Sequence, residues 1–325
     1  MKKYIAILLA AAMATLGISA CRKENSNKET KVQKDSDIKV VTTIFPEYDW
    51  VRQIAGEEAD QMDITMLLDN GVDLHSYQPT AEDIMKVSDC DLFVYVGGES
   101  DAWVDDALKQ AKNKDMQVVD LLDVLGNSAK EEEVIEGMEP EEEEEEPEYD
   151  EHVWLSVKNA EVLSKAIADA LEKVDPDHKD IYQENASAYS EKLKDLDAKY
   201  QEVVDGASQK TLLFGDRFPF RYLVDDYGLS YYAAFVGCSA ESEASFDTIS
   251  FLANKVDELG LKDIMAIENS NQKIAKTIIE NTKEKNQKIL TLDSMQSTTS
   301  DDVKNGTTYL SVMEKNLEVL KEALQ

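Results

Sequence analysis

The chain contains three histidines, and two of them stand in segments typical of ligand-binding turns. His75 lies in DNGVDLHSYQPTAEDI, after a predicted strand and before a predicted helix, and His152 lies in EYDEHVWLS, where an acidic segment meets the next helix. His178 lies in DPDHKD, in the first turn of a predicted helix, and we interpret it as a surface residue. Neutral imidazole is the commonest metal ligand in proteins.

Two aspartates stand in comparable places in the second half of the chain. Asp216 follows the predicted strand TLLF, and Asp293 follows the predicted strand KILTL. In open α/β sheets, ligands bind in the crevice at the carboxyl ends of the strands. Two imidazoles and two carboxylates would form a four-point site for Zn²⁺, Mn²⁺ or Fe²⁺. The alternative is structural, since a lone His after a strand often forms hydrogen bonds and an Asp there often caps a helix.

The elements that would position these residues alternate between short β-rich runs and helical patterns, which favours parallel sheets in two α/β lobes. The predicted strands are residues 38–42, 63–67, 92–96, 117–121, 211–214, 229–235, 263–267 and 288–292. The predicted helices are residues 47–55, 81–88, 102–112, 218–227, 245–259, 275–282 and 309–324. We therefore predict an N-terminal lobe over residues 37–174 and a C-terminal lobe over residues 207–325.

A long helix is predicted between the lobes, over residues 175–206. From Pro176 to Asp205 the segment has no internal Gly or Pro. Its apolar residues recur at intervals of three, four or seven, which gives a helix with one apolar stripe. The stripe consists of Tyr182, Tyr189, Leu193, Leu196, Tyr200 and Val203. Such a helix would act as a rigid strut rather than a hinge.

The first residues predict export from the cytoplasm. Lys2 and Lys3 precede an apolar run that is too short for a comfortable transmembrane helix, as in a secretory signal. The end of this run, ISAC, resembles the bacterial lipobox, in which Cys21 becomes the lipidated first residue. We expect residues 1–20 to be a signal peptide and residues 21–36 a polar tether, so that the protein is extracytoplasmic and lipid-anchored to the cell membrane.

Charge narrows the range of partners. The formal net charge is −33, which disfavours nucleic acid because that partner requires basic patches. Much of this charge lies in residues 129–150, which contain EEEEEE and few apolar residues. We expect this segment to be a disordered acidic loop. Beyond Cys21 the only cysteines are Cys90 and Cys238. Two buried thiols are the simpler expectation for them, and a disulfide is the alternative.

Several segments together resemble the solute-binding lipoproteins of zinc and manganese ABC importers. They are TTIFPEYDWVRQIAG, VDLHSYQPTAEDI, CDLFVYVGG, EHVWLSVKNAEVLSKAIADAL and YLSVMEKNLEVLKEAL, in the family's order and over most of residues 37–325. The resemblance implies two α/β lobes joined by a long helix, with a metal site between them.

The resemblance also suggests individual ligands. The His of the family's D-x-H-x-Y-x-P motif corresponds to His75, the His of its H-V-W-L motif to His152, and its last Asp to Asp293. A third ligand, His or Glu in relatives, precedes a Phe-x-Tyr landmark that falls here on Phe220 and Tyr222. Counted without a gap the position is Arg217, which cannot bind a cation. With a one-residue insertion it is Asp216, which we favour.

The implied function is capture of a divalent transition metal and delivery to an ABC permease. We expect Zn²⁺, with Mn²⁺ or iron as alternatives, because Zn²⁺ binds most such sites more tightly than Mn²⁺ does. We expect a monomer and no enzyme activity, since no HExxH, nucleophile elbow or phosphate loop is present. A surface adhesin is the other alternative. Whether Glu241, Glu243 or Glu268 adds to the site stays open.

Overall fold

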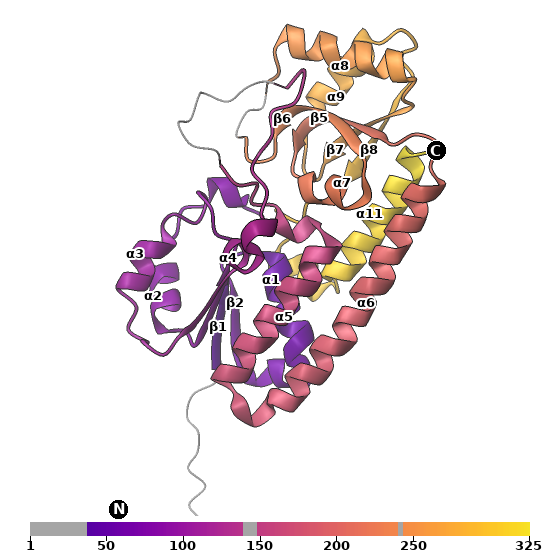
Figure 1. The fold of residues 1–325 in the computed structure, drawn as a ribbon. Coiled ribbons are helices and arrows are strands. Elements are labelled where there is room, and N and C mark those ends of the chain that lie inside the picture. The colour runs from indigo at the N-terminus through magenta and orange to yellow at the C-terminus, as the bar shows by residue number, and fades with distance from the viewer. Residues whose placement is uncertain (1–37, 139–147, 240–242) are drawn as a thin grey trace, which may run out of the picture. The chain divides into compact units, whose positions relative to one another are not determined.

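Two four-stranded parallel sheets form the framework of the computed structural model, which describes residues 38–138, 148–239 and 243–325 (Figure 1). The first sheet has the order β2-β1-β3-β4 and the second has the order β6-β5-β7-β8. The strands are β1 (Ile38–Thr42), β2 (Met62–Met66), β3 (Leu92–Tyr95), β4 (Gln117–Asp120), β5 (Thr211–Phe218), β6 (Ser230–Val236), β7 (Asp263–Ile267) and β8 (Lys288–Leu292).

The helices lie between consecutive strands, except the last two, which follow β8. They are α1 (Phe45–Ala55), α2 (Ala81–Asp89), α3 (Val104–Lys109), α4 (Leu121–Leu125), α5 (Val157–Val174), α6 (Lys179–Gly206), α7 (Arg221–Tyr227), α8 (Phe246–Leu259), α9 (Lys273–Asn281), α10 (Ser300–Lys304) and α11 (Tyr309–Ala323). The predicted two-lobed α/β fold is therefore confirmed. The short helices α4 and α10 were not anticipated, because five residues are too few for a recognisable period.

Local sequence explains where the helices begin. Thr80 Oγ1 accepts a hydrogen bond from the backbone N–H of Asp83, and the Thr80 N–H donates to the Asp83 carboxylate. This reciprocal pair is a capping box, and it starts α2 two residues after Pro79. Ser245 caps α8 in a related way, because its Oγ accepts from the N–H of Thr248.

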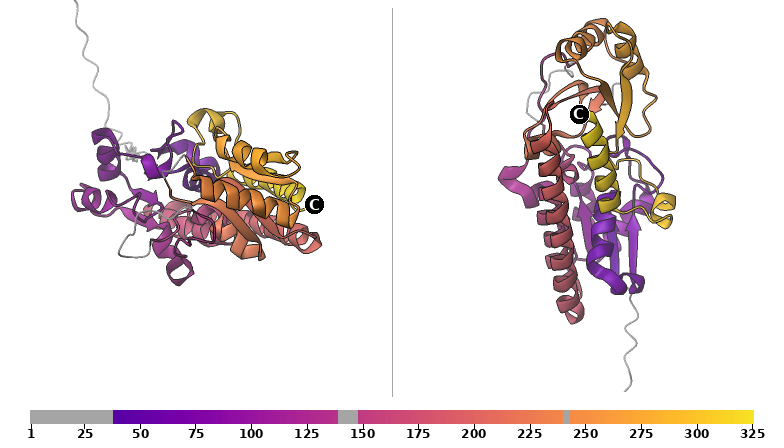
Figure 2. Two further views of the ribbon diagram at one scale, coloured as in Figure 1. Left: turned by 90° about the horizontal axis from the view of Figure 1, so that it is seen from above. Right: turned by 90° about the vertical axis from the view of Figure 1, so that its right-hand side faces the viewer.

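The long helix α6 packs against α5, α1 and α11, so it contacts elements of both lobes (Figures 1 and 2). At 28 residues it is about 42 Å long. It begins after a 3-10 turn, Pro176–His178, rather than directly at Pro176. Its buried stripe ends at Val204 rather than the predicted Val203, since Val204 is four residues after Tyr200 and stays on the same face.

One hydrophobic cluster runs through both halves of the chain. It includes Val40 and Trp50 from the first lobe and Phe214 and Tyr309 from the second. A smaller cluster, with Leu213, Ile249 and Leu252 among its members, lies in the second lobe. A shared core resists separation of the two lobes, because opening them would expose apolar surface to water.

The acidic segment is ordered at both ends. Glu131 pairs with Tyr149 in an antiparallel bridge, and the Asp150 N–H donates to the Lys130 carbonyl over 2.8 Å. The middle of the predicted acidic loop, residues 139–147, lies outside the described residues, and so do the predicted signal peptide and tether. Among the described residues, no helix combines the length and apolar character needed to cross a bilayer.

Candidate metal centre

His75 lies in a single 3-10 turn, Leu74–Ser76, that follows β2. The Asp73 carboxylate begins this turn by accepting the His75 N–H over 3.1 Å. His75 Nδ1 lies 2.9 Å from Ser100 Oγ and 3.4 Å from Glu151 Oε2. A carboxylate oxygen can only accept, so the hydrogen of the His75 ring is best placed on Nδ1, which leaves Nε2 with a free lone pair.

His152 precedes a second 3-10 turn, Val153–Leu155, and is fully buried. Its backbone N–H and its Nδ1 both lie 2.9 Å from Asp150 Oδ1. The Asp150 carbonyl in turn accepts a 2.9 Å hydrogen bond from the Tyr222 hydroxyl of α7, in the other lobe. Nδ1 again carries the hydrogen, and this carboxylate–histidine arrangement orients Nε2 for a metal.

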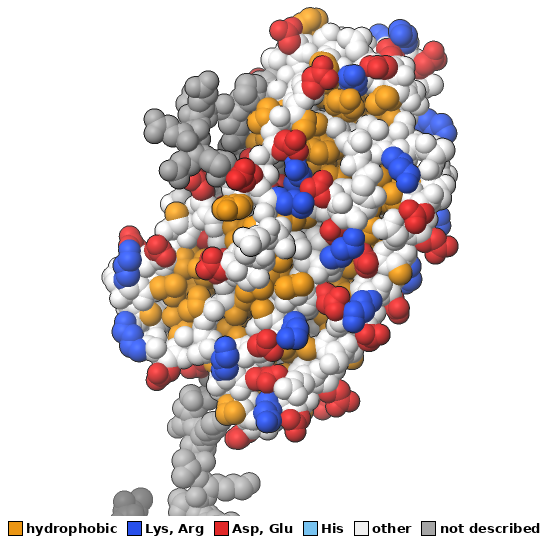
Figure 3. Space-filling view, in the orientation of Figure 1, with side chains coloured by type: hydrophobic (Ala, Val, Ile, Leu, Met, Phe, Trp, Pro, Cys, Tyr) orange, Lys and Arg blue, Asp and Glu red, His pale blue; other side chains and the backbone are white. Residues whose placement is uncertain are grey.

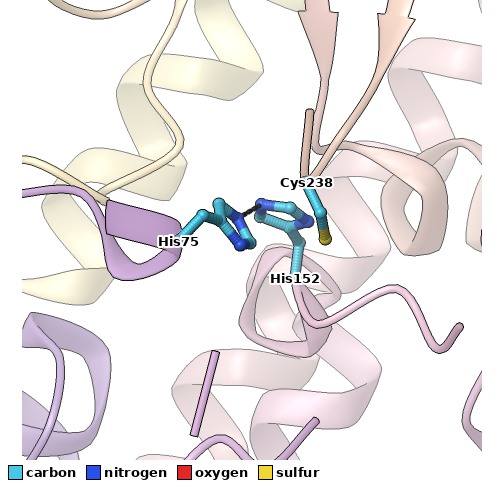
Figure 4. Close-up of side chains that lie close together, drawn as sticks. All are labelled: His75, His152 and Cys238. Carbon is cyan, nitrogen blue, oxygen red and sulfur yellow. Dashed lines mark hydrogen bonds between the residues drawn. The ribbon is translucent and has the colours of Figure 1, made fainter. Parts of the chain in front are cut away.

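The two rings, which both belong to the first lobe, point toward each other (Figure 4). Their Nε2 atoms are 3.1 Å apart. Two nitrogens bound to one tetrahedral Zn²⁺ would be about 3.3 Å apart, given Zn–N distances of about 2.05 Å. Two lone pairs at this separation repel each other unless a proton or a metal cation lies between them. The pair is therefore already arranged for a shared cation.

The carboxylates beside the two imidazole rings favour a positive charge on or between the rings. Burial alone would lower the pKa of His152, but the charge of Asp150 and its hydrogen bond outweigh burial and raise that pKa above the usual value. Burial would raise the pKa of Glu151, yet the hydrogen bond and charge of His75 hold it below the usual value. Both histidines thus have an acidic partner behind the ring.

Cys238 is the third member of the group, and the sequence analysis did not anticipate it. One ligand atom from each of His75, His152 and Cys238 fits within a mutual distance of 4.8 Å. Within the described ranges, no other set of three or more His, Cys, Asp or Glu side chains meets this condition. The sequence did contain one indication of a ligand, since Cys238 follows β6 at its carboxyl end. A buried thiol was nevertheless the simpler expectation for this residue. It is instead half-buried, and both Cys90 and Cys238 are free thiols.

Asp216 is not part of this group, and its predicted position beyond the strand is wrong. It lies inside β5, at an irregularity of register between Phe214 and Arg217. Its Oδ1 accepts the Arg217 N–H over 3.0 Å, and its Oδ2 accepts the Ile267 N–H over 3.4 Å. The strand continues because Arg217 and Phe218 still pair with β6. Asp216 therefore links β5 to β7 at the irregularity of register.

Arg217 stands where the ungapped comparison with the family would put a ligand. Its guanidinium forms an ion pair with Asp73, directly behind the turn of His75. Its positive charge also acts to lower the pKa of His152, so it lies close to the pair. A permanent cation thus stands at this ungapped position and links β5 to the first lobe.

Asp293 follows β8 directly, as predicted, but lies outside the group of three. Its Oδ1 accepts the Met295 N–H over 2.8 Å. Burial and the adjacent Glu268 carboxylate raise the pKa of Asp293 to about 6. Glu268 itself accepts hydrogen bonds from Ser294 and from the Gln296 N–H, so it holds the loop after β8 in place.

The remaining candidates lie elsewhere. Glu243 is exposed and pairs with Lys273, and Glu241 lies outside the described residues. His178 Nδ1 contacts Asp175 over 2.7 Å, and its side chain is 39% exposed, as expected for a surface residue.

Known proteins resemble this chain over most of its length. The family described as ZnuA, periplasmic component A of the zinc-uptake complex, matches residues 40–323. The zinc-binding lipoprotein AdcA of Streptococcus pneumoniae R6 is 35% identical over 98% of this chain. The chain spans only 61% of the length of that relative. The high-affinity zinc uptake protein ZnuA of Bacillus subtilis is 31% identical over 99% of this chain and 98% of its own length.

A solved structure extends the likeness to the fold. The Zn(II)-bound ZnuA-like domain of S. pneumoniae AdcA matches with a TM-score of 0.69 and 31% identity, over 89% of this chain and 99% of that domain. The laminin-binding protein Lmb of Streptococcus agalactiae, described as bifunctional in adhesion and metal transport, matches with a TM-score of 0.71 and 26% identity, over 89% of this chain and all of Lmb. With two lobes, a long connecting helix and a family match along nearly its whole described length, this chain belongs to the ZnuA family of solute-binding transport proteins.

Proposed function

We propose that this protein captures Zn²⁺ outside the cytoplasm and delivers it to the membrane permease of an ABC importer. The observation that carries the proposal is the approach of His75 Nε2 and His152 Nε2 to 3.1 Å, each ring backed by a carboxylate. The names of the relatives support it, since AdcA and ZnuA are both described as zinc proteins.

Asp293, directly after β8 in the second lobe, remains a proposed ligand. Its carboxyl lies beside Glu268, and two adjacent acidic groups are stabilised by a cation nearby. Because imidazoles must be neutral to bind a metal, the affinity should decrease as the pH falls through the histidine range.

The shared core and the long helix support capture through small movements. A site formed by both lobes allows release when a partner changes their relative position slightly. We further propose that Cys21 carries a lipid that keeps the protein at the membrane, near its permease. On the face in Figure 3, the described Lys and Arg side chains stand singly among acidic and apolar ones, so that face offers no basic patch to a nucleic acid.

Titration against a chelator of known affinity tests the metal site. The full chain with Cys21→Ser is compared with the double variant His75→Ala/His152→Ala, and His178→Ala serves as the matched control. We expect the double variant to lose more than about a hundredfold in Zn²⁺ affinity, since changes of groups behind a ligand already cost about 10–100-fold. The control should bind as the parent does. Tight binding by the double variant would refute the proposal.

Transport requires a separate test in cells. A strain lacking this gene should grow poorly under zinc chelation, and the wild-type chain should restore growth. The His75→Ala/His152→Ala chain should fail to restore it at equal expression. Equal rescue by both chains would contradict a role for the histidine pair in uptake.

A further inference from the structure

We propose that Cys238 supplies the third protein ligand of the metal, as a thiolate, so that the site is His₂Cys at its centre. This inference rests on the proposed zinc capture and specifies its chemistry. Ligand atoms of His75, His152 and Cys238 lie within 4.8 Å of one another (Figure 4). In a tetrahedral Zn²⁺ site, with Zn–S near 2.3 Å and Zn–N near 2.05 Å, neighbouring ligand atoms are about 3.3–3.6 Å apart. A contraction of little more than an ångström would bring the three ligand atoms to such distances.

The backbone around Cys238 is fixed next to the His152 ring. A Cβ built on Gly237 would lie 2.9 Å from His152 Cε1 and 3.0 Å from His152 Nδ1. Only a glycine lets the chain pass this close to the imidazole. The next residue is Cys238, so the packing that requires Gly237 also holds the thiol beside the His152 ring (Figure 4).

A second contact fixes Cys238 from the acidic segment. The Cys238 N–H donates to Glu132 Oε1 over 3.0 Å, across 106 residues of sequence. The Glu132 carboxylate is also close enough to His152 for the two charges to interact. Glu132 is therefore a positioning residue, which joins the ordered base of the acidic segment to the loop after β6.

Asp216 and Arg217, the other candidates for the position of the third ligand, already form other interactions. Both oxygens of Asp216 accept backbone hydrogen bonds within the second sheet. Arg217, which stands at the family's ligand position, is paired with Asp73. Among the His, Cys, Asp and Glu side chains of the second lobe in the described segments, only Cys238 forms such a group with both histidines.

A thiolate ligand would also select the metal. Coordination replaces the S–H bond of Cys238 by an S–metal bond, and the proton leaves to bulk water. Soft thiolate ligands favour Zn²⁺, whereas carboxylate and water oxygens suit Mn²⁺. A His₂Cys centre therefore predicts discrimination against Mn²⁺ that a His₂Asp₂ site would lack.

Cobalt spectroscopy tests the assignment directly. The full chain with Cys21→Ser retains two thiols, at Cys90 and Cys238, and is loaded with Co²⁺ in place of Zn²⁺. A near-ultraviolet thiolate-to-cobalt charge-transfer band should appear. It should disappear in Cys238→Ser and persist in Cys90→Ala, the matched control whose thiol is buried in the first lobe. Circular dichroism confirms that each variant is folded, and Cys238→Ala replaces Cys238→Ser if the latter fails to fold.

Zinc affinities measured on the same variants distinguish this proposal from the broader one. Cys238→Ser should weaken Zn²⁺ binding by at least about a hundredfold, and Asp216→Asn by less than about tenfold. A parent that binds Zn²⁺ tightly without any thiolate band, and that loses affinity only with Asp216→Asn, would overturn the role of Cys238 and leave zinc capture intact. A parent that binds neither Zn²⁺ nor Co²⁺ would overturn both.

Discussion

At the scale of single residues, the histidine pair depends on neighbours that bind no metal. Asp150 fixes the His152 ring through Nδ1, and Ser100 and Glu151 lie against Nδ1 of His75. Gly237 leaves no room for a side chain beside the His152 ring. Such neighbours set the direction of each lone pair, and misplacing a ligand by a few tenths of an ångström weakens a metal site.

Gly237→Ala tests this dependence without removing a ligand. The new methyl group would lie about 3 Å from the His152 ring, so the ring or the loop must shift. We expect a loss of at least about tenfold in Zn²⁺ affinity, measured by chelator competition. Gly206→Ala, at the end of α6 with open space around its Cα, is the control and should bind normally. Unchanged Zn²⁺ affinity in Gly237→Ala would show that the added methyl group fits beside the His152 ring, and would contradict this dependence.

The sequence indicated His75 and His152 through their motifs, but not Cys238 or the position of Asp216. Cys238 meets His152 and Glu132 over 86 and 106 residues of sequence, contacts that no local pattern encodes. Asp216 was misplaced because the run TLLF suggested a strand ending at Phe214. The strand continues past an irregularity of register, which only the pairing with β6 reveals.

At the scale of elements, the long helix α6 was predictable because its apolar residues repeat with the helical period. Tyr200 adds a contact that the pattern could not suggest, since its hydroxyl donates to the Met313 carbonyl of α11 over 2.7 Å. The strands β1, β7 and β8 were predicted with their observed bounds. Helix ends were less accurate, because 3-10 turns such as Pro176–His178 share the same sequence signals.

The buried stripe of α6 should dominate the stability of this element. Leu193→Ala removes a side chain that is 1% exposed, and we expect a loss of about 2–5 kcal/mol in the free energy of unfolding. Lys192→Ala, at an exposed neighbouring position, should change it by less than about 0.5 kcal/mol. Urea unfolding measures both. A loss below about 1 kcal/mol in Leu193→Ala would mean that the stripe is loosely packed.

The loop between β3 and α3 contains a buried acid that makes stability depend on pH. Asp101 Oδ2 accepts the N–H groups of Val96 and Gly97, while its Oδ1 has no hydrogen-bond partner in the described structure. Burial, aided by the charge of Glu151, raises the pKa of Asp101 to about 7 from 3.8. The folded state therefore binds this proton more tightly than the unfolded state does.

Because the pKa of Asp101 is higher in the folded state, the free energy of unfolding should decrease as the pH rises. The contribution of Asp101 to stability is fully present below about pH 4, decreases as the pH rises, and is lost above about pH 7. Asp101→Asn keeps an acceptor for both N–H groups and removes the titration. We expect unfolding free energies between pH 4 and pH 7 to fall more steeply in the parent than in Asp101→Asn, by a few kcal/mol in total. Exposed Asp105→Asn is the control, and parallel curves for parent and Asp101→Asn would contradict the assignment.

At the scale of the whole described structure, the two lobes share one hydrophobic cluster and one long helix. Further bonds cross between them, since Trp154 Nε1 donates to the Ser294 carbonyl and the Tyr309 hydroxyl donates to the Trp154 carbonyl. These contacts surround the segment that carries His152. A metal ion bound to residues of both lobes should therefore raise the free energy of unfolding of the two lobes together, in one transition.

Urea unfolding with and without Zn²⁺ tests this coupling. With free Zn²⁺ at about 1,000 times its dissociation constant, the gain should be about 4 kcal/mol in a single transition. Fluorescence of the tryptophans, which lie in the first lobe, and circular dichroism of the whole chain should give the same midpoint. Two separate transitions, with only one shifted by Zn²⁺, would contradict the coupling.

X-ray absorption at the zinc edge of the Zn²⁺-loaded full chain tests the central claim most directly. The chain has only three histidines, so the imidazole signal has few possible sources. The account predicts two imidazoles at Zn–N distances of about 2.0–2.1 Å, together with one sulfur at about 2.3 Å. His75→Ala/His152→Ala should lose the imidazole signal, while His178→Ala should keep it. A zinc ion surrounded by oxygen alone, or an imidazole signal that survives in the double variant, would contradict the account.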